Sequence, residues 1–161
     1  MRTARRSAPD ARLVHAIWGV LLTFAWLDVG WMIYLGLGIV TGGAQRMSGP
    51  GYRGITLVPD ELGLSPHLFW GIPLIVGGSA FLLGLFAHNK VGFWLRIAGI
   101  VVGALAAGSL YAFFTVTSAA NPRVGNTAPP TYLFVAGFQL AMLYGAVFTR
   151  RIEPTIRTTK G

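Results

Sequence analysis

The stretch LVHAIWGVLLTFAWLDVGWMIYLGLGIV, residues 13–40, decides the fold of this chain of 161 residues. It contains one charged side chain, Asp28, near its middle. An α-helix rises 1.5 Å per residue, so a helix of this length measures about 42 Å. The hydrocarbon core of a bilayer is only about 30 Å thick. We therefore predict a membrane-spanning helix that tilts, protrudes or kinks near Gly36 and Gly38.

Three further apolar runs follow, at residues 66–87, 91–118 and 131–149. Hydrophobic residues make up 53% of the chain and charged residues 11%, whereas about 25% of the residues in a soluble globular domain are charged. Each run is long enough to cross a bilayer as a helix. We predict an all-α fold, an integral membrane four-helix bundle that forms one membrane domain over residues 13–149.

The longest polar segment between the predicted spans is residues 41–64, which is rich in glycine and proline. This composition predicts a loop and no continuing helix, although residues 55–58 are suited to a short extended piece. Ser65 and Pro66 follow as a typical N-cap and first helical residue, so we predict that the second span begins at Pro66.

Positive charge gathers in a basic N-terminal segment, residues 1–12, which we expect to be disordered, and in a basic tail, residues 150–161. With four spans both termini lie on one side, and that side carries ten of the thirteen lysines and arginines. The other three are Arg46, Arg53 and Arg123. Because basic residues accumulate on the cytoplasmic side, we predict a multi-pass protein of the cytoplasmic (inner) membrane with both termini in the cytoplasm.

Several aromatic residues lie close to the ends of the predicted spans, where such side chains commonly anchor a protein at the membrane interface. They are Trp18, Trp70, Trp94 and Tyr132. The net charge of +8 would suggest nucleic-acid binding in a soluble protein, but no basic stripe interleaved with aromatic residues lies outside the spans. We therefore expect no nucleic-acid partner.

Small residues spaced four apart mark the faces on which three of the predicted spans pack. Helices in lipid associate by close backbone approach, which such residues permit. The positions are Ala80 and Gly84 in the second span, Gly99, Gly103 and Ala107 in the third, and Gly137, Ala141 and Gly145 in the fourth. The pattern fits packing within one chain, self-association, or contact with another membrane protein, and the sequence leaves these alternatives open.

Asp28 needs a particular explanation, because an aspartate at the centre of a span costs about 3 kcal/mol on insertion scales. Counted from the span ends, Ser79 and Gln139 lie at a similar depth. We therefore predict an intramembrane polar cluster of Asp28, Ser79 and Gln139, in which a neutral carboxyl group is hydrogen-bonded to Gln139 or to a serine. Three roles remain open: a link between helices, a water-filled or proton-linked path, and contact with a partner protein.

The residues that usually carry catalysis or bind metals are sparse. The chain has no cysteine, and no Ser–His–Asp set or phosphate-binding glycine loop is present. His15 and His88 lie at the same predicted membrane face, which would allow a haem between them, but His67 lies at the opposite face and no second carboxylate accompanies the pair. We expect no enzymatic activity, no metal site and no cofactor.

The order of these features resembles the small four-span membrane proteins that bacteriophages of high-GC Gram-positive bacteria encode. The shared features are an arginine-rich start, a tryptophan in the first span, Pro130-Thr131-Tyr132 at the entry to the last span and Arg150-Arg151 at its end. Some proteins of this kind act in lysis, including holins. The resemblance implies a non-enzymatic, membrane-perturbing protein that acts through helix–helix association.

A shorter stretch resembles a segment that precedes a span in the small four-span subunit of actinobacterial cytochrome oxidase. It comprises Asp60-Glu61-Leu62-Gly63, Ser65-Pro66-His67 and Trp70. Two spans precede the segment in that family, whereas one predicted span precedes it here. This resemblance implies an accessory subunit of a larger membrane complex, the second functional hypothesis. A small transporter or channel that uses Asp28 is the third.

Overall fold

The computed structural model describes residues 11–49, 52–87, 89–120 and 128–158, and within these ranges the chain is helical, without strands. The helices are α1 (Ala11–Arg46), α2 (Arg53–Glu61), α3 (Pro66–Phe86), α4 (Lys90–Ala120) and α5 (Ala128–Thr158). Three segments are long and apolar enough to cross a membrane: Gly19–Gln45, Pro66–Phe86 and Lys90–Ala119. They coincide with the first three predicted spans, as expected of a multi-pass membrane protein.

The fourth predicted span, residues 131–149, lies within α5. The side chains from residue 146 onward are outside the described part of the chain, so this span stays a prediction. The predicted disordered segment, residues 1–12, also lies mostly outside the described residues, and its last two residues begin α1.

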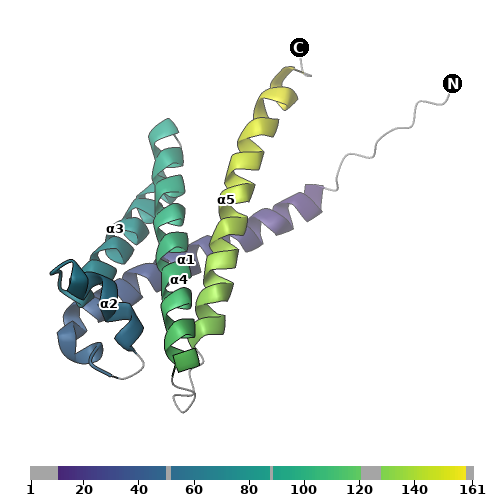
Figure 1. Ribbon diagram of the computed structural model, residues 1–161. Coiled ribbons are helices and arrows are strands. Elements are labelled where there is room, and N and C mark those ends of the chain that lie inside the picture. Colours follow the sequence, from purple (N-terminus) through teal and green to yellow (C-terminus); the bar gives the residue numbers. More distant parts are fainter. Residues whose placement is uncertain (1–10, 50–51, 88, 121–127, 159–161) are drawn as a thin grey trace.

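The long helices pack in chain order. α3 packs against both α1 and α4, and α4 packs against α5. Figure 1 shows α1 running obliquely behind α4 and α5, so that the N-terminal end of α1 and the C-terminal end of α5 extend away from the other helices. The short α2 lies at the opposite end of the molecule from the C-terminal end of α5.

A kink near Gly36 and Gly38 is one of the three alternatives predicted for the long first helix, and no non-helical backbone lies there in α1. Its non-helical backbone lies instead at Gly43, with φ 58° and ψ −162°, a conformation that glycine adopts readily. Gly36 lies at the crossing of α1 with α3, where a Cβ would come within 2.9 Å of the carbonyl oxygen of Gly71. Gly36 therefore permits close helix packing and does not bend the chain.

The prediction that residues 41–64 form a loop with an extended piece at 55–58 is wrong over residues 53–61, which form α2. The helical backbone of α1 is interrupted at Gly43, as the glycine content predicts, and a short helical piece then runs to Arg46. α2 ends in a Schellman motif: the amide of Leu64 donates to the carbonyl of Pro59 at 2.8 Å, and Gly63 has a φ of 66°. This motif satisfies carbonyl groups at the helix end.

Tertiary contact explains why a segment with proline and glycine is helical. Pro59 has no amide hydrogen to donate to the carbonyl of Ile55, and the indole Nε1 of Trp70 donates to that carbonyl instead, at 2.9 Å. Gly54 lies against α4, where a Cβ would be 3.0 Å from the carbonyl oxygen of Phe113. The helix is therefore stabilised by α3 and α4 and not by its own composition.

α3 begins at Pro66, as predicted, with Ser65 in the N-cap position. The Ser65 side chain makes no capping hydrogen bond. Its backbone carbonyl accepts hydrogen bonds from the amides of Leu68 and Phe69, each at 3.0 Å, so the start of the helix depends on Pro66 and the backbone.

Two predicted interfacial anchors have other roles. Trp70 is buried and holds α2 through its indole, and the Tyr132 ring stacks on Phe114 with a centroid distance of 5.4 Å and an interplanar angle of 5°. Trp94 is exposed, in keeping with an anchor. The side chain of Trp18 lies outside the described part of the chain.

Candidate functional site

The structure joins Asp28 on α1 to Gln139 on α5. The side-chain amide Nε2 of Gln139 donates to both carboxyl oxygens of Asp28, at 2.8 Å to Oδ1 and 3.1 Å to Oδ2. Asp28 is 6% exposed and Gln139 is fully buried. A hydrogen bond between polar side chains is the usual way to satisfy such groups within a membrane.

α4 makes room for this pair. A Cβ at Gly103 would overlap the Gln139 amide and would lie 2.9 Å from the Sδ atom of Met32. The absence of a side chain at Gly103 therefore lets the amide of α5 reach the carboxyl group of α1. Gly103 was expected only to bring helices together, and the structure adds this second role.

One polar atom of the pair has no partner among the described residues. The Oε1 atom of Gln139 is buried and accepts no hydrogen bond from them. A buried acceptor left in this state costs about 1–3 kcal/mol. An amide oxygen and an ionised carboxylate can only accept hydrogen bonds. An ionised Asp28 therefore cannot donate to Oε1, whereas a protonated Asp28 can.

Ser79 is half-buried on α3 and, within the described residues, donates no hydrogen bond to Asp28. Of the three predicted cluster members, the structure therefore links two directly. Apolar side chains lie on both sides of this pair along the helices: one buried cluster includes Met32, Leu74 and Leu110, and another includes Ala25, Phe81 and Met142.

The small residues predicted to pack helices fall into two groups. Those on α3 and α4 lie inside the chain: Gly84, Gly99 and Gly103 are buried, Ala107 is fully buried and Ala80 is half-buried. Those on α5 lie on its outer side, where Gly137 and Ala141 are exposed and Gly145 is half-exposed. A Cβ at Gly137 or Gly145 would meet no atom of the described chain within 4 Å.

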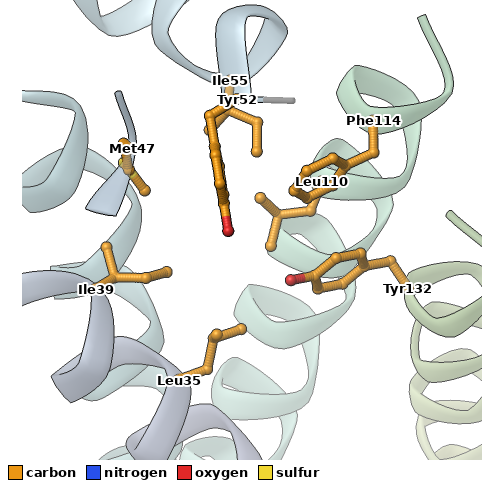
Figure 2. A pocket seen from close by; sticks show the side chains of 8 residues that line it. All are labelled: Leu35, Ile39, Met47, Tyr52, Ile55, Leu110, Phe114 and Tyr132. Atoms are coloured by element: carbon orange, nitrogen blue, oxygen red, sulfur yellow. The ribbon is translucent and has the colours of Figure 1, made fainter. Parts of the chain in front are cut away.

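A cavity of about 60 Å³ lies beneath α2 and the end of α1. It is lined by side chains from four helices and the segment after α1: Leu35, Ile39, Met47, Tyr52, Ile55, Leu110, Phe114 and Tyr132. Figure 2 shows the hydroxyl groups of both tyrosines pointing into this space, Tyr52 from the top of the view and Tyr132 from the right. Apart from the thioether of Met47, the other lining side chains are alkyl or aromatic, so the two phenols are the polar side-chain groups among them.

The sequence does not indicate this cavity, because the composition of residues 41–64 predicts a loop. Tyr52 precedes α2 and packs edge-on against Phe114, with a centroid distance of 5.7 Å. An aromatic residue after a glycine-rich segment was the available signal, but its partners on α4 and α5 are distant in sequence.

Within the described residues no group of three or more histidine, cysteine, aspartate or glutamate side chains is placed to hold a metal ion. His15 and His88, the two residues considered for haem, lie outside the part whose side chains are described. Compared with protein-family models, with curated proteins and with solved structures, the chain matches none of them.

Proposed function

We propose that this is a non-enzymatic, multi-pass protein of the cytoplasmic membrane that acts through helix–helix association, with the outer face of α5 (Gly137, Ala141 and Gly145) as the contact surface. The supporting observation is that Gly137 and Ala141 are exposed and that a Cβ at Gly137 would meet no described atom within 4 Å, whereas the small residues of α3 and α4 lie inside the chain. The proposed partner is a second copy of the chain.

Lipid offers no hydrophobic drive for helices to associate, so contact depends on shape and close packing. On α5 the glycine and alanine positions form a smooth strip beside two large exposed side chains, Phe134 (71% exposed) and Tyr144 (70%). A strip of small residues beside bulky ones suits a helix that approaches along the strip and packs against the rings.

The more specific form of this proposal is a holin-like protein that perturbs the membrane after it self-associates. The resemblance to phage-encoded four-span proteins supports it. In the accessory-subunit alternative the same face of α5 meets another membrane protein. That alternative would be favoured if the tagged chain co-purified with a defined complex and not with a second copy of itself.

The proposal includes a topology in which α5 is the fourth span and both termini are cytoplasmic. The distribution of basic residues supports this orientation. Fusions of a reporter that is active only outside the cytoplasm test it: a fusion after Glu61 should be active and a fusion after Gly161 inactive. Activity of the C-terminal fusion would mean that α5 does not cross the membrane.

A substitution that fills the α5 face tests the association directly. Energy transfer between two differently labelled copies in membranes is expected for the wild type and should be lost in Gly137→Leu. Gly30→Leu is the matched control, because Gly30 is also an exposed helical glycine whose Cβ would meet no described atom within 4 Å.

The same two variants test the holin-like form. Expression of the wild type should collapse the membrane potential and arrest growth, Gly30→Leu should do the same, and Gly137→Leu should leave cells energised. Equal association of Gly137→Leu and the wild type would contradict the assigned surface. Normal association without any loss of potential would contradict the holin-like form alone.

A further inference from the structure

The cavity beneath α2 lies in line with the Asp28–Gln139 pair along three helices. On each of the three helices, seven residues separate the level of the pair from the level of the cavity. The steps are Asp28 to Leu35 on α1, Gly103 to Leu110 on α4 and Gln139 to Tyr132 on α5. Seven residues correspond to two helical turns and about 10 Å, with a rotation of only about 20°. The cavity therefore lies directly between the buried carboxyl group and the end of the molecule that carries α2.

The cavity is suited to water. A buried water needs about 10–15 Å³ of cavity volume and two to four polar partners. The cavity of about 60 Å³ therefore has room for about four water molecules. Both phenol groups that point into it can donate and accept hydrogen bonds. Tyr52 comes from the segment before α2 and Tyr132 from the start of α5, so waters here would lie between the two.

Buried apolar side chains lie between the cavity and the carboxyl group. They include Met32, Leu74 and Ala107, each fully buried, with Trp31 packed against the same cluster. Methionine is unbranched with three rotatable bonds, so it moves aside more easily than a branched or aromatic residue. A route from the cavity to Asp28 would therefore pass Met32.

The hydrogen bonds of the pair suit a group that gains and loses a proton. In the structure Nε2 of Gln139 donates to both carboxyl oxygens, the arrangement that a carboxylate accepts, and no donor in the described part of the chain reaches Oε1. A proton on Asp28 supplies that donor: after rotation of the amide, the carboxyl O–H donates to Oε1 while Nε2 still donates to the other carboxyl oxygen. Each protonation state therefore has a hydrogen-bonded form.

Other titratable groups on the packed helices lie away from this level. On α4, Arg96 lies two turns from Gly103 towards the opposite end and donates to the carbonyl of Gly92. On α5, Tyr144 is 70% exposed on the outer side, and on α3, His67 lies near the start of the helix. The described parts of these helices place no cation beside Asp28 that would hold it permanently ionised.

We propose that Asp28 is a proton-binding site that exchanges its proton with the α2 side of the protein through the Tyr52–Tyr132 cavity. On release, the carboxyl O–H bond breaks and the electron pair stays on the carboxylate. A water that enters past Met32 accepts the proton and passes it to the water of the cavity. The carboxylate is then held by Nε2 of Gln139. This activity goes beyond the association proposed above, and Asp28→Asn is expected to leave self-association intact.

Infrared spectroscopy of the full chain in lipid vesicles tests the proposal. The wild type should show the C=O stretching band of a protonated carboxylic acid, the band should be missing in Asp28→Asn, and transfer to D₂O should shift it as the proton exchanges. Tyr52→Phe/Tyr132→Phe should slow this exchange roughly tenfold, the factor that loss of about one hydrogen bond carries. The control, Tyr34→Phe, alters a tyrosine that is 77% exposed on the outside of α1 and should exchange at the wild-type rate.

A second variant covers the case in which the double substitution disturbs the fold, as judged by circular dichroism. Leu35→Phe fills the cavity while keeping both phenols, and it should slow exchange to a similar extent. The proposal is overturned if no Asp28-dependent carboxylic acid band exists. It is also overturned if that band does not exchange, or if a folded cavity variant exchanges as fast as the wild type.

Discussion

At the α3–α4 interface glycines bring the two backbones into contact, whereas α5 is joined to α1 through side chains. A Cβ at Gly99 would lie 2.7 Å from the carbonyl oxygen of Gly77, and a Cβ at Gly84 would lie 2.8 Å from that of Gly92. α5 packs along α4 and is joined to α1 by the Gln139–Asp28 hydrogen bonds and by ring contacts such as Phe24–Phe138, with a centroid distance of 4.8 Å.

This difference indicates two kinds of stability in one chain. Backbone contact between α3 and α4 tolerates no added volume, because interiors are close-packed and carbonyl groups cannot move aside. Side-chain contact at α5 depends on a polar pair whose energy changes with its protonation and its partner. α5 should therefore be the helix whose attachment is easiest to alter without disturbing the rest.

The largest effect is expected from filling the α3–α4 interface. Gly99→Val should reduce the free energy of unfolding by about 3 kcal/mol, the upper part of the usual range for overpacking. Titration with a denaturing detergent, followed by circular dichroism, measures the change. Gly108→Val is the matched control, because a Cβ at Gly108 on the same helix would meet no described atom within 4 Å. Equal effects of the two substitutions would contradict backbone contact at Gly99.

A smaller loss should follow from removal of the amide that holds α5. Gln139→Met keeps the shape of the side chain but leaves Asp28 buried without its donor, which should cost about 2 kcal/mol. Asp28→Leu/Gln139→Met removes both partners and should recover most of that loss. The same detergent titration measures both variants. A double variant less stable than Gln139→Met would contradict this expectation. It would mean that Asp28 still contributes to stability when the amide of residue 139 is absent.

The sequence was sufficient for the parts of the fold that depend on composition and length. The apolar runs located α1, α3 and α4, and Pro66 located the start of α3. Counting from the span ends also placed Asp28 and Gln139 at one depth, where the structure joins them. These inferences use local information, since the depth of a residue in a membrane follows from its position along its own helix.

The parts that the sequence did not predict depend on contacts between distant residues. α2 is helical because Trp70 accommodates the carbonyl that Pro59 leaves free, and neither residue alone predicts a helix. The small residues of α5 have the same spacing as those of α4, yet they lie on the outside. Spacing identifies a face on which a helix can pack, but it does not say whether that face turns towards its own chain.

A still smaller loss of stability is expected at α2, a short helix that one buried hydrogen bond joins to α3. Trp70→Phe removes the Nε1 donor and leaves the Ile55 carbonyl unpaired, which should cost about 1 kcal/mol, mostly as local opening of α2. Trypsin cleavage after Arg53, an exposed residue in α2, should become faster by about fivefold. Trp94→Phe, which alters an exposed tryptophan on α4, should leave the rate unchanged.

The smallest effect on the fold is expected from Gly137→Leu, although the same change should abolish association. The added side chain enters open space, so its free energy of unfolding should differ from that of Gly30→Leu by less than about 0.5 kcal/mol. Comparing the two variants also cancels the gain in helix propensity that both share. A loss of about 2 kcal/mol specific to Gly137→Leu would mean that the outer face of α5 is already packed within one chain. An unchanged stability with lost association would instead separate the face that folds the protein from the face that joins two copies of it.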